Sequence, residues 1–407
     1  MNAPFEIPSH VPADRVIDFD FGNVPGATED PHLAWKKLHD GPDIVWTPHY
    51  GGHWIATRAE DIEFIQRDHE HFSHREFSLP KGVQPFRLAP LEYDPPKHGP
   101  YRAVINPAFT PKAVGNLEGE ARALAVELIE GFKTKGECEF VEDFAHHLPV
   151  RMFLRMANLP LEHRDRFLGW ATTIVHGVDK KQKQAAFRAT VEYLAEIIAE
   201  RSRDPGTDLM SHVITSKVNG ELMEPEVIKG MTALLFFGGL DTVASMMSFI
   251  AIFLARHPGH RKQLIANPAL IPNAIEEFLR RFGLSNTIRT LTMDFEYKGI
   301  HFKKDDMIQV PISLSGMDER HYPNAMEVDF NRKPLHLTFG SGPHRCPGSM
   351  LARTEIRVFI EEWLKRIPDF EIKAGEKPLT VTGAMHGVVN LPLSWKVSPL
   401  NQATLNP

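Results

Sequence analysis

The sequence predicts a mainly α-helical fold with a small β region, and three observations support this. Charged and apolar residues alternate at the helical period over 114–133 and again over 162–203. A long apolar stretch over 226–257 has the length of a single extended helix. Short alternating segments with turn residues occur over 290–311 and 370–395, which is typical of short strands. Helices should therefore dominate, with strands near the C-terminus.

The composition is that of one globular unit. The chain has 407 residues, enough for two average domains, but it lacks a Ser/Gly-rich linker, charge block or low-complexity break, so we expect a single domain over 1–407. Hydrophobic residues make up 42% and charged residues 24%, which is usual for a protein with a sizeable core. The net charge of −6 argues against nucleic-acid binding.

Cysteine usage and the first residues bear on the compartment. Cys138 and Cys346 are the two cysteines, and if one of them binds a metal the other has no disulfide partner, which favours a reducing, cytoplasmic location. The first eight residues contain neither a basic region nor an apolar run. We therefore expect no signal peptide and no membrane anchor.

The N-terminal part predicts a short helix, a hairpin and a second helix. The helical pattern covers about 32–39 and 59–67, and the strand-like segments 44–46 and 53–57 flank Gly51-Gly52. Prolines interrupt the apolar stretch over 73–93, which predicts an irregular loop.

Two pairs of basic or histidine side chains follow. Asp94-Pro95-Pro96 predicts a helix start, and His98 and Arg102 then fall four apart on one helix face, where they could clamp a pair of carboxylates or simply face solvent. The adjacent His146 and His147 point to different sides of a helix, so we interpret them as structural or surface residues rather than metal ligands.

The long apolar stretch has a polar interruption. It is long enough for a membrane span, yet Gly238, Gly239 and Asp241 lie in its middle. Each glycine costs roughly 1 kcal/mol relative to alanine in a helix, and a buried acid is costly unless it is paired or used. A helix that crosses the core beside a flat cofactor would explain these residues, with Asp241 and Thr242 handling protons. The alternative is a buried helix with a glycine contact and a satisfied Asp–Thr cap.

A glycine-rich loop near the C-terminus has the features of a thiolate site. Phe339–Gly348 contains glycines and Cys346, and a helical pattern follows it, with Pro347 at the expected first helical position. Free backbone amides at a helix start stabilise a negative sulfur, so the loop could present a thiolate to iron. The alternative is a turn with a buried structural cysteine.

This loop matches, position for position, the haem-binding signature of the cytochrome P450 superfamily, which the chain resembles over nearly its whole length. The resemblance implies haem b (iron protoporphyrin IX) held between a long central helix and the cysteine loop and helix, with Cys346 as its axial thiolate ligand. The haem-contacting residues carried over are His98, Arg102, Gly238, Arg289, Phe339, His344, Cys346 and Gly348.

The resemblance extends to two further motifs. The run Gly238–Val243 is similar to the oxygen-activation motif of the soluble bacterial camphor monooxygenase family, which implies that Asp241 and Thr242 deliver protons. Glu277 and Arg280, three apart on one helix face, would be an incidental pair if exposed. The family completes such a pair with a later arginine, here Arg332, in a structural role.

One departure from the camphor monooxygenase family concerns the substrate. A tyrosine of that family donates a hydrogen bond to the ketone of camphor, and the matching position is Phe86, which has no hydroxyl. A compact apolar terpenoid, an ether such as cineole, or a norisoprenoid is therefore favoured over camphor. The same matching gives the pocket residues Phe86, Leu234, Phe237, Ser285, Thr287, Ala384 and Met385.

The resemblance implies a monooxygenase that uses O₂ and electrons from a 2Fe-2S ferredoxin with its NADH-dependent reductase. The donor would dock near Cys346 on a basic patch of Lys97, Arg102, Arg332, Lys333 and Arg345. Two alternatives remain, a peroxygenase driven by hydrogen peroxide and a non-catalytic haem-thiolate sensor or carrier. Asp241-Thr242 speaks against the first, since a peroxygenase needs no such pair.

Overall fold

The computed structural model describes residues 6–82, 86–176 and 180–397. The helices are α1 (Pro31–Lys36), α2 (Ala59–Arg67), α3 (His98–Ile105), α4 (Pro111–Phe132), α5 (His147–Met156), α6 (Arg164–His176), α7 (Lys180–Arg203), α8 (Leu209–Thr215), α9 (Pro225–Arg256), α10 (Pro258–Ala266), α11 (Ile271–Arg281), α12 (Ile312–Ser315) and α13 (Ser349–Arg366). The strands are β1 (Ile44–Thr47), β2 (His53–Ala56), β3 (Phe72–Ser73), β4 (Glu137–Glu139), β5 (Lys217–Val218), β6 (Glu221–Leu222), β7 (Asn286–Leu291), β8 (Phe295–Tyr297), β9 (Ile300–Phe302), β10 (Met307–Pro311), β11 (Glu371–Ile372), β12 (Leu379–Val381), β13 (Gly387–Asn390) and β14 (Pro392–Ser394). The predicted fold class is confirmed.

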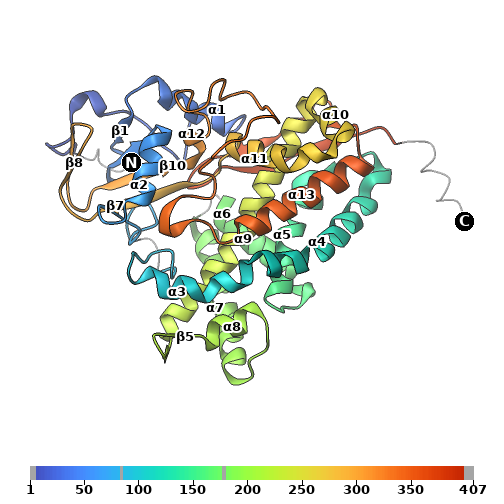
Figure 1. Ribbon diagram of the computed structural model, residues 1–407, viewed down its shortest axis with the longest axis horizontal. Helices are drawn as coiled ribbons and strands as arrows, with labels where there is room; N and C mark the ends of the chain where they lie inside the picture. Colours follow the sequence, from blue (N-terminus) through green and yellow to red (C-terminus); the bar gives the residue numbers. More distant parts are fainter. Residues whose placement is uncertain (1–5, 83–85, 177–179, 398–407) are drawn as a thin grey trace, which may run out of the picture.

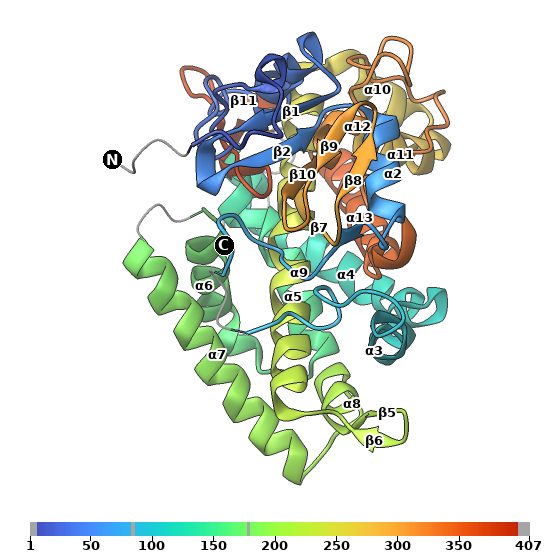
Figure 2. The ribbon, with the colours of Figure 1, turned by 90° about the vertical axis from the view of Figure 1, so that its left-hand side faces the viewer.

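Helix α9 is the long central helix of the protein and contributes to two hydrophobic clusters. It runs beside α13 and links the region of the β-sheet to the region of α7 and α8 (Figures 1 and 2). Its first half belongs to a hydrophobic cluster with α5 to α8, and its second half to a cluster with α4, α11 and α13. By length and composition α9 could cross a membrane, but 76% of its most apolar window is buried inside the protein, as in a core helix.

The main sheet has the strand order β1-β2-β10-β7-β3. The predicted hairpin is present, with β1 antiparallel to β2, while β10 runs parallel to β2 and antiparallel to β7. Trp54 of β2 and Ile308 of β10 are fully buried, together with Trp35 of α1, in a third hydrophobic cluster. Strand β7 begins at Asn286, before the expected β region, because its residues 286–290 pair with β10. This pairing directs alternate β7 side chains towards the interior.

Two predicted helix starts are displaced. Helix α13 begins at Ser349 with Gly348 as its N-cap, so the expectation that Pro347 is the first helical residue is wrong. The first helical hydrogen bond, from the Ala352 N–H to the Gly348 carbonyl, leaves Pro347 in the loop. Helix α3 begins at His98, whose N–H donates to the Asp94 carbonyl at 2.9 Å, and the Asp94 carboxylate accepts the backbone N–H of His74 instead of capping α3.

Candidate active site

A cavity of about 330 Å³ lies between α9, the cysteine loop with α13, and β7, and its wall is mainly apolar. Most of the residues expected to bind haem or substrate meet there. The predicted residues that line it are His98, Arg102, Leu234, Gly238, Thr242, Ser285, Thr287, Arg289, Phe339, His344, Cys346 and Gly348. These residues come from α3, α9, β7 with the residue before it, and the cysteine loop, so the fold brings them together from distant parts of the sequence.

The cysteine loop holds the Cys346 sulfur at the cavity. Gly340 and Gly342 take left-handed backbone angles, with φ of 72° and 69°. A Cβ on Gly342 would lie 2.9 Å from the Gln66 carbonyl oxygen, so glycine is needed there. The Cys346 N–H donates to the Phe339 carbonyl at 2.8 Å, which closes the loop. Cys346 is exposed to the cavity that it lines.

Burial raises the pKa of the Cys346 thiol, although the Gly348 N–H and Arg102 act in the opposite direction. A metal cation bound to the sulfur would favour its deprotonated form. On the opposite wall, a Cβ on Gly238 or Gly239 would meet no protein atom within 4 Å. The absence of side chains at these two cavity-lining positions leaves room for a planar group such as haem.

Basic and imidazole groups gather at one end of the cavity. The rings of His98 and His344 are 4.2 Å apart, and His74 stacks on His344 at 3.4 Å. Within the part of the chain that the structure describes, the buried Nε2 atoms of all three histidines and the Nε of Arg289 have no hydrogen-bond partner. Burial lowers the pKa of His344 to about 2 and that of Arg289 to about 9. Such unpaired donors fit the two propionates of haem, whose negative charge would favour their protonated forms.

Asp241 and Thr242 face different surroundings. Thr242 lines the cavity, and its hydroxyl donates to the Gly238 carbonyl at 3.3 Å. Asp241 is buried outside the cavity wall, where the Ser245 hydroxyl donates to it at 3.4 Å and His146 Nε2 lies 3.8 Å away. His146 is itself only 6% exposed, so it is not a surface residue. The helix thus separates an acid on one side from a hydroxyl on the other.

Glu277, Arg280 and Arg332 form a buried network instead of an exposed pair. Arg280 donates to both carboxylate oxygens of Glu277 at 2.8 Å, and Arg332 Nε donates to the same carboxylate at 3.1 Å. Glu277 and Arg280 are fully buried. Arg280 also donates to the carbonyls of Ala325 and Glu327, at 2.6 and 2.8 Å, and so ties α11 to the segment before the cysteine loop.

Four predicted pocket residues lie away from the cavity wall. Phe86 and Phe237 both pack on Phe187 of α7. The ring centroid of Phe187 lies 5.8 Å from that of Phe86 and 5.7 Å from that of Phe237. Ala384 and Met385 lie behind β7, where the Ala384 carbonyl accepts the Asn286 N–H at 2.8 Å and Met385 forms a bridge with Ser285. They support the wall through their backbone.

Two cavity residues, His74 and Glu355, were not predicted from the sequence. His74 lies in the irregular loop, and the stacking that brings it to His344 is a tertiary contact. Glu355 of α13 lines the cavity, has one carboxylate oxygen without a partner among the described residues, and has its pKa raised by burial to about 8. Glu355 could have been noticed in the sequence, because it is an acid on the apolar face of the helix that follows Cys346.

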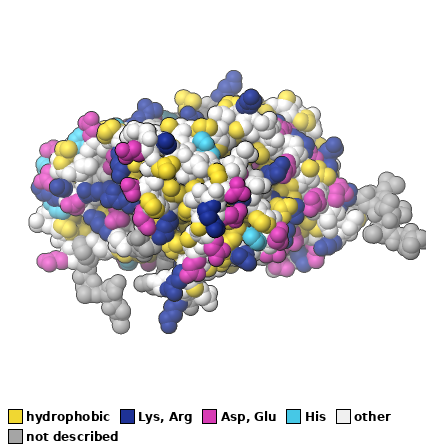
Figure 3. All heavy atoms as spheres, turned by 90° about the horizontal axis from the view of Figure 1, so that it is seen from below, with side chains coloured by type: hydrophobic (Ala, Val, Ile, Leu, Met, Phe, Trp, Pro, Cys, Tyr) yellow, Lys and Arg dark blue, Asp and Glu magenta, His cyan; other side chains and the backbone are white. Residues whose placement is uncertain are grey.

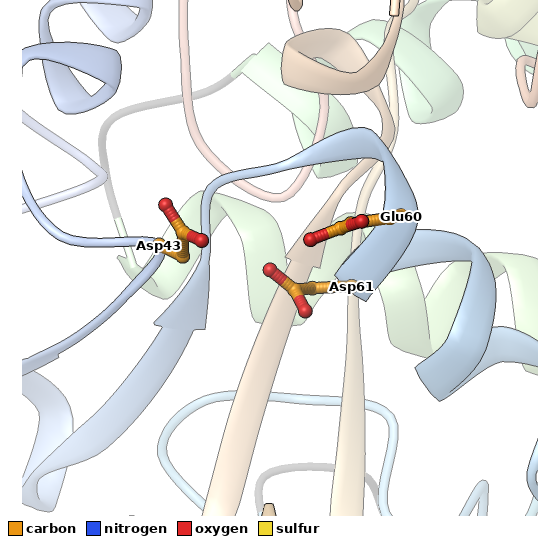
Figure 4. A group of neighbouring side chains, drawn as sticks. All are labelled: Asp43, Glu60 and Asp61. Carbon is orange, nitrogen blue, oxygen red and sulfur yellow. The ribbon is translucent and has the colours of Figure 1, made fainter. Parts of the chain in front are cut away.

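Three carboxylates outside the cavity lie close enough together to bind a metal ion. The carboxylates of Asp43, Glu60 and Asp61 converge within 4.8 Å between β1 and the start of α2 (Figure 4). Lys298 Nζ contacts all three, at 2.8 Å from Asp61 and 3.5 Å from Asp43, and the Tyr297 hydroxyl donates to Asp61 at 2.8 Å. The lysine already supplies the positive charge that these acids need.

Comparison with known proteins agrees with the site. Residues 129–398 match the family "Cytochrome P450". The chain is 35% identical to "Probable cytochrome P450 127A1" of Sinorhizobium fredii over 96% of this chain and 97% of that one, and 32% identical to "Steroid C26-monooxygenase" of Mycobacterium tuberculosis over 79% and 91%. The crystal structures of CYP101J2 and CYP101C1 both superpose with a TM-score of 0.89, at 36% and 35% identity, over 96% of this chain and all of theirs. The chain therefore belongs to the cytochrome P450 family of haem b monooxygenases.

Proposed function

We propose that this P450 hydroxylates a compact apolar substrate, such as cineole, a camphor-like terpenoid or a norisoprenoid. The observation that carries the proposal is that the Cys346 sulfur and the Thr242 hydroxyl line one cavity with a mainly apolar wall. Haem b supplies iron for activating O₂ when it is bound between them. Leu234 offers an apolar contact beside Thr242, and an apolar pocket of this kind selects by shape more than by hydrogen bonds.

The proposed roles follow from position. Cys346 binds iron, and His98, Arg102, Arg289 and His344, joined by His74, hold the propionates. Thr242 orients and passes protons at its hydroxyl, Asp241 supplies them, and Glu277, Arg280 and Arg332 keep the cysteine loop in place. Because α9 contributes to two of the hydrophobic clusters, we also propose that the chain is one domain.

We propose that a 2Fe-2S ferredoxin, reduced by an NADH-dependent reductase in the cytoplasm, supplies the electrons. Lys97, Lys333 and Arg345 are exposed around the cysteine loop and could meet an acidic partner. Arg332 is a less suitable contact because Glu277 holds it, and Arg102 lines the cavity. On the face that Figure 3 shows, basic and acidic side chains are interspersed, which suits a local protein contact more than nucleic-acid binding.

A titration with terpenoids tests the substrate class. We expect a low-to-high-spin shift with at least one compact apolar compound, and hydroxylated product with NADH, ferredoxin and reductase. Product with peroxide alone would indicate a peroxygenase, and binding without turnover would indicate a carrier. Thr242→Ala should keep the spectrum but lower product per NADH by about tenfold, because proton delivery contributes at least this much.

A further inference from the structure

Asp241 is connected to solvent by a line of titratable side chains. His146 Nε2 lies 3.8 Å from Asp241 Oδ1, and His146 Nδ1 lies 3.9 Å from Glu142 Oε1. The side chains of Asp241 and His146 are 5% and 7% exposed, whereas that of Glu142 is 64% exposed. The line therefore begins at the surface with Glu142 and ends at the buried acid next to Thr242.

The backbone explains why His146 points inward. Residues Val141–Ala145 form a π-helical turn, and the His146 N–H donates to the Val141 carbonyl five residues back at 3.1 Å. Such a turn rotates the following side chain relative to a regular helix, and π-turns occur often at functional sites. α9 packs against this turn and against α5, so the rotated imidazole meets the polar side of α9.

Both contacts of His146 are longer than a hydrogen bond, so neither carboxylate fixes the ring. A shift of about 1 Å would close either contact to hydrogen-bond distance. Imidazole can carry a proton on either nitrogen near neutral pH and is suited to moving protons between two acids. A purely structural histidine would instead be expected to hold one fixed partner.

We infer that His146 passes protons from the Glu142 side to Asp241, an inference that rests on the proposed monooxygenase function. In one transfer, Nδ1 takes a proton from Glu142 or from solvent water, and the Nε2 proton moves to the Asp241 carboxylate. The ring is neutral again, and exchange with solvent or a ring flip restores its first tautomer. Asp241 then holds the proton for Thr242, its neighbour on the cavity side of α9.

The test compares His146→Gln with His147→Gln in the haem-loaded enzyme. Glutamine keeps a polar group near Asp241 but cannot relay a proton, so His146→Gln should lower product per NADH by about tenfold and raise the solvent isotope effect. Asp241→Asn should have a similar effect, and the double variant should be no worse, because both residues act in one path. His147→Gln is the matched control, because it makes the same change at the adjacent residue, and it should behave as the parent enzyme. His146→Asn replaces the glutamine variant if that variant does not fold.

A second readout does not depend on turnover. In the ferrous–CO form, ¹⁵N NMR of the imidazole should show the Nε2 signal of His146 moving in Asp241→Asn and the Nδ1 signal moving in Glu142→Gln. Unchanged signals, or normal coupling in His146→Gln while Asp241→Asn is impaired, would overturn the inference and leave the proposed function intact. No hydroxylated product from the parent enzyme, with both NMR signals still moving, would overturn the proposed function instead.

Discussion

The two sides of the cavity are built differently. Around the cysteine loop, charged groups hold each other: the buried Glu277 binds Arg280 and Arg332, and the half-buried Glu276 accepts two hydrogen bonds from Arg353, at 2.6 and 2.8 Å. On the opposite side, the wall is apolar packing between α5, α8 and α9. Figure 2 shows this part, with α6 and α7, set apart from the sheet. The side that holds the cofactor is fixed by directional hydrogen bonds. On the side that meets substrate, apolar packing allows different side chains to form the wall.

The largest expected effect is on the side held by charges. Glu277→Gln would leave Arg280 and Arg332 buried without their anion, and removing one partner of a buried pair costs about 3–5 kcal/mol. Denaturant unfolding should show this loss together with poorer haem retention. Asp165→Asn is the control, because Asp165 is 80% exposed in its pair with Arg164 and should change stability by less than about 1 kcal/mol. Equal effects of the two substitutions would contradict the comparison.

Glu355→Gln should produce an effect that grows with pH. Burial raises the pKa of Glu355 to about 8 from 4.5, so the folded protein keeps this proton where the unfolded chain has lost it. Stability of the parent protein then falls as pH rises from about 4.5 to 8, whereas glutamine has no proton to lose. The variant should match the parent at pH 5 and exceed it by about 3 kcal/mol at pH 8. If the difference in free energy of unfolding between variant and parent stays the same from pH 5 to pH 8, the pKa of Glu355 is not raised in the folded protein.

The smallest effect concerns the apolar side. Leu234→Ala removes part of the cavity wall and should weaken binding of the compact substrate by about tenfold, the value of a few buried methyl groups. Phe86→Tyr is the matched control, because its ring packs on Phe187 outside the wall, and it should change the affinity for camphor by less than about twofold. A tenfold gain for camphor in Phe86→Tyr would mean that the ring reaches the substrate.

The same difference explains what the sequence could predict. The Phe339–Gly348 loop is a local motif, so a candidate thiolate site could be predicted from the sequence. The structural role of Glu277 and Arg280 followed only from the family resemblance, because their spacing alone would equally fit an incidental exposed pair. His74 and His146 could not be predicted in this way, because one depends on stacking with His344 and the other on a π-helical turn against α9. Phe86 was expected in the pocket, but the irregular loop turns its ring towards α7. Apolar packing has many solutions for one pattern, and periodicity does not choose among them.

The most direct test of the account is the ferrous–CO spectrum of the parent protein beside those of Cys346→Ala and Cys138→Ala. Cys138 is the matched control, since it is a free, buried cysteine in β4 away from the cavity wall. The account predicts a thiolate-type CO band in the parent and in Cys138→Ala, and its complete loss in Cys346→Ala. A thiolate band that survives in Cys346→Ala, or its absence from the parent protein, would contradict the central claim that Cys346 binds the haem iron.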